Sequence, residues 1–381
     1  MVTTPMNATQ QNSPDGFERR PAALSIYLGA AALMLGPDAD DAARQKHGKA
    51  MASMLSGIRK YQDHGYRRPS PAIESRWQAG TVRLLFYPSA TPNAQPLLII
   101  PSMINGSEIL DILPDRSFTR WMAAQGFDVY LLDWGRMVDD PALHTMGGVI
   151  DDRVMVAVNY LHDTYGHAPH AIGYCMGGTL LAVAAALYPD KFNKMAFLSA
   201  PWDFHAGNPR MTAQVVAGAA SALQMIDAGP TLPMDWVQKV FAAVNPQRAL
   251  TKFASFLEMA ADTPQEQMFI AVEDWLNGGH DLPSGVARVC IMDWYGHNRP
   301  VNGAWQVGDR TVGLDHLDAG KMMVVAAMRD LLVPPESALS LCKDHPDAAI
   351  LRPDCGHISL MAGRNAMETV WAPLADWLKT G

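Results

Sequence analysis

Gly173-Tyr174-Cys175-Met176-Gly177-Gly178 is the stretch that decides the fold of this chain, and an apolar run, 179–184, follows it directly. Glycines at both ends allow a strand to turn sharply into a helix, and they leave the central side chain exposed at the tip of the turn. This is the pattern of a nucleophile elbow, with cysteine where most such elbows carry serine. We therefore predict that the thiol of Cys175 attacks a carbonyl carbon.

Strand and helix patterns alternate on both sides of this stretch. The apolar runs that predict strands are 82–87, 97–100, 128–134, 195–200, 322–328 and 348–351. The stretches that predict helices are 117–125, 151–165, 335–343 and 365–379. Alternation of this kind implies a parallel sheet with right-handed crossovers and with its catalytic groups at the carboxyl ends of the strands. The predicted fold class is α/β, an α/β-hydrolase fold whose mostly parallel sheet is flanked by helices.

The alternation also gives the expected domain boundaries. Residues 1–20 are polar and predict a disordered tail, and 21–75 predict an N-terminal helical segment. Within that segment the apolar run 22–36 is shorter than the ~20 residues that a membrane span needs, so we expect no transmembrane segment. We assign 76–200 and 317–381 to the hydrolase core, and 201–316 to a helical cap insertion rich in Trp, Met and Pro.

Composition excludes several classes of protein. Among 381 residues, 49% are hydrophobic and 18% charged, which is typical of a globular protein with a substantial core. The net charge is −8 and lysine and arginine form no cluster, so we expect no nucleic-acid binding. The four cysteines form no Cys-x-x-Cys pair, which argues against a disulfide framework or a zinc site. With no secretory signal at the start of the sequence, we expect a reducing, cytoplasmic location and no metal.

Two residues downstream of the elbow complete a catalytic triad in the order found in α/β-hydrolases: nucleophile, acid, histidine. Asp330 ends the predicted strand that begins at Met322, and His357 lies in the loop before the final helix. In this interpretation His357 takes the proton of Cys175, and Asp330 orients the imidazole and stabilises its charge. Asp330 has an alternative role as the N-cap of the helix that follows it.

The other three thiols, Cys290, Cys342 and Cys355, have no elbow around them, and we expect them to be structural. An oxyanion hole needs two backbone N–H groups. We predict that Met176, directly after the nucleophile, supplies one of them. The second is expected from the loop after the strand 97–100, at Met103 or Ile104.

The choice of cysteine narrows the chemistry. A serine acyl-enzyme formed from a thioester gives up the group-transfer potential of the thioester, whereas a cysteine acyl-enzyme keeps it. This suits acyl transfer from coenzyme A to an alcohol if water is excluded, which the predicted cap insertion would do. Coenzyme A is then a substrate and no cofactor is expected. Arg116, Arg210 and Arg299 are candidates for binding it.

At this point the chain resembles the polyhydroxyalkanoate synthase family. The segments that carry the resemblance lie between Leu97 and Leu378; they are 104–105, 109–111, 115–117, 129–135, 173–179, 201–204, 273–275, 330–335 and 356–358. The Leu-Leu-Asp-Trp-Gly segment, 131–135, and the Gly-x-Cys-x-Gly-Gly box are the most specific of these. One departure is Gly106, where family members commonly carry a basic residue.

The resemblance implies a Cys-His-Asp enzyme that polymerises (R)-3-hydroxyacyl groups from coenzyme A thioesters into polyester. Cys175, Asp330 and His357 match the catalytic positions of the family. The expected ligands are hydroxyacyl-CoA and the polyester chain, with a homodimer or a partner subunit, and with association at the granule surface. The residues leave one alternative open, a thioesterase or polyhydroxyalkanoate depolymerase that uses the same triad with water as the acceptor.

Overall fold

The computed structural model describes residues 28–29 and 39–380. The predicted disordered tail, 1–20, and nearly all of the apolar stretch 22–36 lie outside the described residues. None of the helices in the described ranges is long and apolar enough to cross a membrane. The described part of the chain divides into two compact units: a small unit of the described residues up to 67 together with 245–277, and a large unit of 68–244 and 278–380.

The large unit is built on one eight-stranded sheet with the order β1-β2-β6-β3-β7-β8-β13-β14. The strands are β1 (Ser75–Ala79), β2 (Val82–Tyr87), β3 (Gln95–Ile100), β6 (Phe127–Asp133), β7 (His170–Tyr174), β8 (Met195–Leu198), β13 (Met322–Val325) and β14 (Ala349–Leu351). β2 pairs antiparallel with both of its neighbours, and every pair from β6 to β14 is parallel. The α/β fold predicted from the sequence is confirmed.

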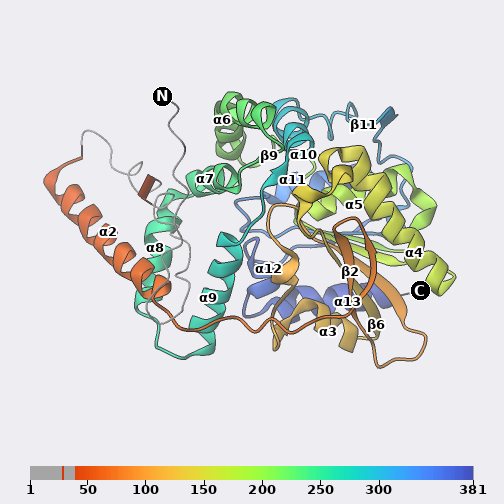
Figure 1. The fold of residues 1–381 in the computed structure, drawn as a ribbon, viewed down its shortest axis with the longest axis horizontal. Helices are drawn as coiled ribbons and strands as arrows, with labels where there is room; N and C mark the ends of the chain where they lie inside the picture. Colours follow the sequence, from red (N-terminus) through yellow and green to blue (C-terminus); the bar gives the residue numbers. More distant parts are fainter. Residues whose placement is uncertain (1–27, 30–38, 381) are drawn as a thin grey trace. The chain divides into compact units, whose positions relative to one another are not determined.

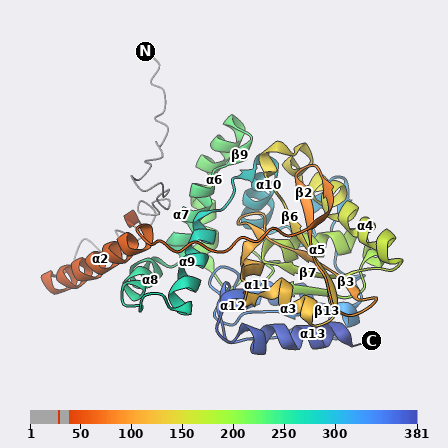
Figure 2. The ribbon, with the colours of Figure 1, turned by 60° about the horizontal axis from the view of Figure 1, so that its bottom comes forward.

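The central strands are short runs of apolar residues because both faces of the sheet are covered. Every residue of β7, β8 and β13 is buried. Figures 1 and 2 show α3 and α13 together on one face and α4 and α5 on the other. The helices are α3 (Phe118–Ala124), α4 (Met155–Tyr165), α5 (Met176–Leu187), α11 (Pro335–Leu339), α12 (Ser359–Ala362) and α13 (Ala372–Lys379).

The predicted elements are present, with differences at their ends. The predicted helix 151–165 starts as a π-helical segment, η4 (Gly148–Val154), and the predicted helix 365–379 starts as another, η9 (Met367–Trp371). The predicted strand 322–328 ends at Val325, because its neighbour β14 is only three residues long and ends opposite that residue. The segment 326–330 then forms the loop that carries Asp330, and its backbone still donates hydrogen bonds to the segment 351–355.

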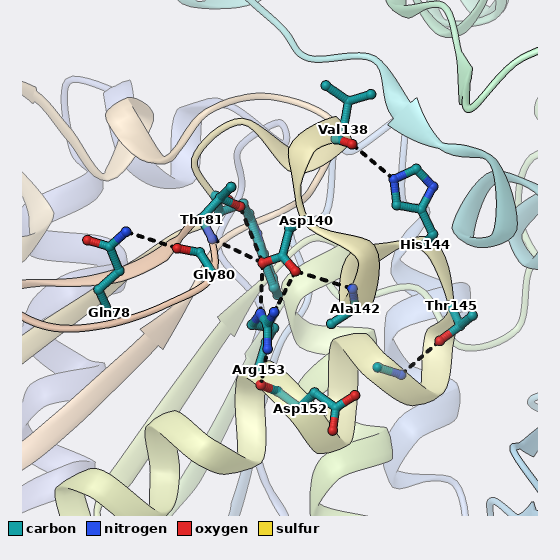
Figure 3. A network of polar contacts seen from close by, with 12 residues as sticks. Gln78, Gly80, Thr81, Val138, Asp140, Ala142, His144, Thr145, Asp152 and Arg153 are labelled. Atoms are coloured by element: carbon teal, nitrogen blue, oxygen red, sulfur yellow. Dashed lines mark hydrogen bonds and ion pairs between the residues drawn. The ribbon is translucent and has the colours of Figure 1, made fainter.

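A buried ion pair fixes the turn between β1 and β2 to the end of η4. Figure 3 shows Asp140 accepting hydrogen bonds from Nε and Nη2 of Arg153, at 2.8 and 2.5 Å, and from the backbone N–H of Thr81, at 3.0 Å. Asp140 is 1% exposed. Burial alone would raise the pKa of Asp140, but the guanidinium of Arg153 and the backbone N–H groups hold it below its usual range. The carboxylate is thus charged and fully paired.

The predicted cap insertion, 201–316, is divided between the two units. The part in the large unit holds α6 (Pro209–Ala228), β9 (Thr231–Leu232), α7 (Met234–Val244), β10 (Leu282–Pro283), α10 (Ser284–Arg288), the π-helical η6 (Val289–Gly296), β11 (Gln306–Val307) and β12 (Arg310–Thr311). A cluster of aromatic rings lies at its centre, formed by Trp202, Phe204, Trp294 and Trp305. Asn298 joins η6 to the segment after β8, since its side chain accepts from the N–H of Phe204 and donates to Asp203.

The rest of the insertion, 245–277, belongs to the small unit instead. There α8 (Pro246–Leu257) and α9 (Pro264–Asn277) pack with the N-terminal helix α2 (Asp41–Gln62). The apolar residues of α2 recur at helical spacing and share a core with those of the insertion; this core contains Met54, Ile58, Tyr61, Leu250, Phe253, Phe256 and Ile270. The sequence predicted a helical N-terminal segment and a helical insertion, but it did not predict that α2 would pack with α8 and α9.

Candidate active site

Cys175 lies at the tip of a tight turn between β7 and α5, as the sequence predicts. Its backbone has φ 56° and ψ −129°, a left-handed conformation that is strained for a residue with a side chain. Its N–H donates to the carbonyl of Leu198, at 2.9 Å, and its carbonyl accepts from the N–H of Gly178, at 2.8 Å. The turn is therefore held on both sides, and the thiol remains partly exposed.

The glycines of the elbow are required by close backbone contacts. A Cβ added at Gly177 would collide with the carbonyl oxygen of Ile100, and one added at Gly178 would collide with the Cβ of Ala200. At Gly173 an added Cβ would meet the first turn of α5. The helix can approach the strand ends this closely only because these positions carry no side chain.

His357 and Asp330 form a buried, hydrogen-bonded pair. Nδ1 of His357 lies 2.6 Å from Oδ2 of Asp330, and the side chains are 8% and 0% exposed. The other carboxylate oxygen, Oδ1, accepts from the backbone N–H groups of Leu332 and Val333, at 2.8 and 2.9 Å. These two bonds fix the carboxylate in the loop after β13, so it can orient the imidazole.

Asp330 and His357 each stabilise the charged form of the other. Burial would raise the pKa of Asp330, but the charge and hydrogen bond of His357 and the two backbone donors hold it below its usual range. Burial would likewise lower the pKa of His357, yet Asp330 raises it well above its usual value, and an electrostatic interaction and a hydrogen bond with Cys175 raise it further. The structure thus brings Cys175, His357 and Asp330 together.

Tyr174 is a residue of this site that the sequence interpretation did not assign. Its ring stacks on the imidazole of His357, with centroids 5.1 Å apart, and its hydroxyl donates to the His357 carbonyl, at 3.2 Å. Burial, followed by electrostatic interactions with Cys175 and Asp330, raises the pKa of Tyr174 well above its usual value. Its position between two elbow glycines was the only sequence signal for a role in the site. Its contact with His357, 183 residues away, can be seen only in the folded structure.

The cap contributes a second tyrosine. Burial raises the pKa of Tyr295, at the end of η6, and an electrostatic interaction with Cys175 raises it further. It also packs edge-on against Phe204, with centroids 5.1 Å apart. No local pattern in the sequence singles it out.

The predicted oxyanion residues come from two places. Met176 is the first residue of α5, directly after the elbow. In the loop after β3, the N–H of Ile104 already donates to Oγ of Ser102, at 3.1 Å, and its carbonyl accepts from the N–H of His280. This leaves Met103 as the stronger candidate for the second donor.

The other cysteines and the candidate arginines lie in different surroundings. Burial raises the pKa of Cys290, of Cys342 and, to about 11, of Cys355, so these thiols are protonated at neutral pH. Arg116 donates to the carbonyl of Arg364, and Arg299 pairs with Asp293. Among the residues described, no group of His, Cys, Asp and Glu side chains could hold a metal ion.

Comparisons with known proteins identify the fold family of the chain. A model described as the alpha/beta hydrolase fold matches residues 95–363. The chain is 28% identical over 298 residues to a poly(3-hydroxyalkanoate) polymerase subunit PhaC from Allochromatium vinosum, covering 76% of this chain and 83% of that protein. The protein of the same name from Haloferax mediterranei is 27% identical over 307 residues, which cover 79% of this chain and 62% of the relative. The alignment thus spans less than two thirds of that relative's length.

Among solved structures, a thermophilic esterase from Thermogutta terrifontis aligns with a TM-score of 0.48 at 16% identity. The alignment covers 82% of this chain and 98% of the esterase.

Proposed function

Because this chain belongs to the α/β-hydrolase fold family, we propose that it is an acyltransferase of the polyhydroxyalkanoate synthase type. It polymerises (R)-3-hydroxyacyl groups from coenzyme A thioesters into polyester. The observation that carries the proposal is a thiol at the tip of a nucleophile elbow, beside the His357–Asp330 pair. The likeness to poly(3-hydroxyalkanoate) polymerase subunits supports the choice of substrate.

In the first step Cys175 becomes acylated. His357 holds on Nε2 the proton that the Cys175 thiol gives up, and the sulfur forms a bond to the carbonyl carbon of the coenzyme A thioester. The carbonyl oxygen becomes negative, and the N–H groups of Met176 and Met103 stabilise it. The bond from this carbon to the coenzyme A sulfur then breaks, and coenzyme A leaves as a free thiol with the proton from His357.

In the second step a hydroxyl group takes the place of coenzyme A. The hydroxyl at the end of a hydroxyacyl chain gives its proton to His357, and its oxygen bonds to the acyl carbon. The bond to the Cys175 sulfur breaks, the thiol regains the proton, and the chain is one ester unit longer. Asp330 keeps its charge throughout and stabilises the imidazolium that forms in each step.

The cysteine also supports transfer over hydrolysis. The acyl-enzyme remains a thioester, so ester formation with an alcohol stays favourable in the second step. Cys175 is partly buried, and exclusion of water from the acyl-enzyme would favour transfer to the alcohol.

The test supplies purified protein with 3-hydroxybutyryl-CoA and follows free coenzyme A and the acyl product. Polyester or oligomer with release of coenzyme A supports the proposal, whereas release with free acid alone means that the chain is a hydrolase. Cys175→Ala abolishes release, and the matched thiol variant Cys355→Ala changes the rate less than twofold. Persistent activity in Cys175→Ala would refute the assignment of the nucleophile.

Because both relatives are named as polymerase subunits, the proposal extends to assembly. We expect the chain to work as a homodimer or with a partner subunit, in the cytoplasm at the surface of polyester granules. Light scattering with and without substrate measures the molar mass of the protein assembly. A monomer at all concentrations during polymerisation would contradict this expectation.

A further inference from the structure

Ser199 combines two energetic costs at one position. Its φ is 40°, a left-handed conformation that glycine adopts more readily. Its side chain is fully buried, and its Oγ has no hydrogen-bond partner in the described part of the chain. A buried hydroxyl without a partner destabilises the folded state, and such groups are rare in native proteins.

The sheet register brings Ser199 beside the nucleophile. β7 and β8 pair in parallel up to Tyr174 and Leu198, so Cys175 and Ser199 are the first residues beyond the ends of two adjacent strands. Adjacent strands lie about 4.8 Å apart. Both residues have positive φ, and each follows the last residue of a strand at the carboxyl edge of the sheet.

Contacts on both sides hold this segment in place. The N–H of Ser199 donates to the carbonyl of Val325, at 2.8 Å. Two residues further on, the carbonyl of Pro201 accepts from Oγ1 of Thr179, at 2.7 Å. The backbone therefore cannot move toward a partner for the hydroxyl without disturbing the elbow. A glycine at this position would remove both the strain of the positive φ and the unpaired hydroxyl.

We propose that Ser199 is a specificity-determining residue of the acyl pocket, whose hydroxyl hydrogen-bonds the oxygen at C3 of the acyl group carried by Cys175. This inference rests on the proposed function. The C3 oxygen lies three bonds from the carbonyl carbon that is bonded to the Cys175 sulfur. The acyl group supplies the partner that the protein does not, and an acyl group without this oxygen leaves the hydroxyl unsatisfied.

The experiment compares 3-hydroxybutyryl-CoA with butyryl-CoA as acylating substrates. Rapid mixing measures the first turnover as release of coenzyme A, and intact-protein mass reports the acyl group on Cys175. The ratio of second-order acylation rate constants gives the preference for the 3-hydroxyl. The variants are Ser199→Ala and Ser199→Gly; the second avoids strain if the first folds poorly. Ser337→Ala, which changes a serine 2% exposed on α11, is the matched control.

In both Ser199 variants we expect the preference to fall about five- to tenfold, the value of one neutral hydrogen bond, with a Tm no lower than that of the wild type. Ser337→Ala keeps the wild-type preference. An unchanged ratio, or equal losses on both substrates, would overturn the role of Ser199 while leaving the proposed function intact. A wild-type protein that releases no coenzyme A from 3-hydroxybutyryl-CoA contradicts the proposed function, and the role of Ser199 with it.

Discussion

Replacing Asp330 by asparagine tests the proposed triad without changing its shape. The amide oxygen can keep the two backbone hydrogen bonds that Oδ1 accepts, at 2.8 and 2.9 Å. The amide nitrogen then faces Nδ1 of His357 at the position of Oδ2, 2.6 Å away. Because this nitrogen is a donor, Nδ1 becomes an acceptor, and the proton of the neutral imidazole moves to Nε2.

An imidazole with its proton on Nε2 cannot accept the proton of Cys175. The variant also lacks the charge that stabilises the imidazolium, so we expect kcat/KM to fall about 10³- to 10⁴-fold. This corresponds to about 4–5.5 kcal/mol of lost transition-state stabilisation. The fold should remain, since the exchange is nearly isosteric and keeps three hydrogen bonds.

The assay measures release of coenzyme A from 3-hydroxybutyryl-CoA at limiting substrate. Asp354→Asn is the matched control, because this carboxylate lies three residues from His357, is 82% exposed and pairs with Arg329. We expect it to change kcat/KM less than twofold. If Asp330→Asn kept more than a tenth of the wild-type value, or if both variants lost the same amount, the assignment of the acid would be refuted.

The same variant gives a stability profile with a definite sign. The lowered pKa of Asp330 means that its contribution is present above the unfolded value of about 3.9 and is lost as the pH falls through the folded value. The raised pKa of His357 means that its contribution is complete below about 6.5 and is lost as the pH rises through the folded value. Urea unfolding should therefore show the largest difference between wild type and Asp330→Asn at about pH 4–6.5; a difference independent of pH would contradict the ion pair.

Three further substitutions test the supports of the site. Gly177→Ala places a Cβ against the backbone at the end of β3, so we expect the free energy of unfolding in urea to fall by about 1–3 kcal/mol and most activity to be lost. Its control, Gly147→Ala, lies in open space at φ −58° and should change neither stability nor activity. Asp140→Ala leaves the guanidinium of Arg153 without its buried partner, so we expect the free energy of unfolding to fall by about 3–5 kcal/mol. A decrease below 1 kcal/mol would refute the importance of this pair. Tyr174→Phe removes the hydrogen bond to the loop of the proposed base, which should lower stability by about 1 kcal/mol and kcat more than KM; an effect on KM alone would contradict a positioning role.

Much of the site was predictable because its signals are local. The spacing of the glycines around Cys175 specifies a strand–turn–helix junction, since only residues without a side chain allow the helix to pack this closely. The order of strands and loops then places Asp330 and His357 at the same edge of the sheet, because parallel strands present their carboxyl ends together.

Other features of the site have no local signature. The sequence offered Met103 and Ile104 equally as oxyanion donors, but a hydrogen bond from Ile104 to Ser102 separates them in the structure. Tyr295 lies 120 positions beyond Cys175 in the sequence and reaches it only through the packing of the cap. The pairing of α2 with the helices of 245–277 likewise depends on matching apolar faces far apart in the chain.

The sequence by itself determined the α/β fold, the elbow and the order of its three candidate catalytic residues, because backbone conformation and periodic burial are encoded by near neighbours. Only the tertiary structure decided what surrounds the thiol. The strained, unsatisfied hydroxyl of Ser199 stands beside Cys175 through strand register, and register is set by the packing of the whole sheet rather than by residues adjacent in the chain.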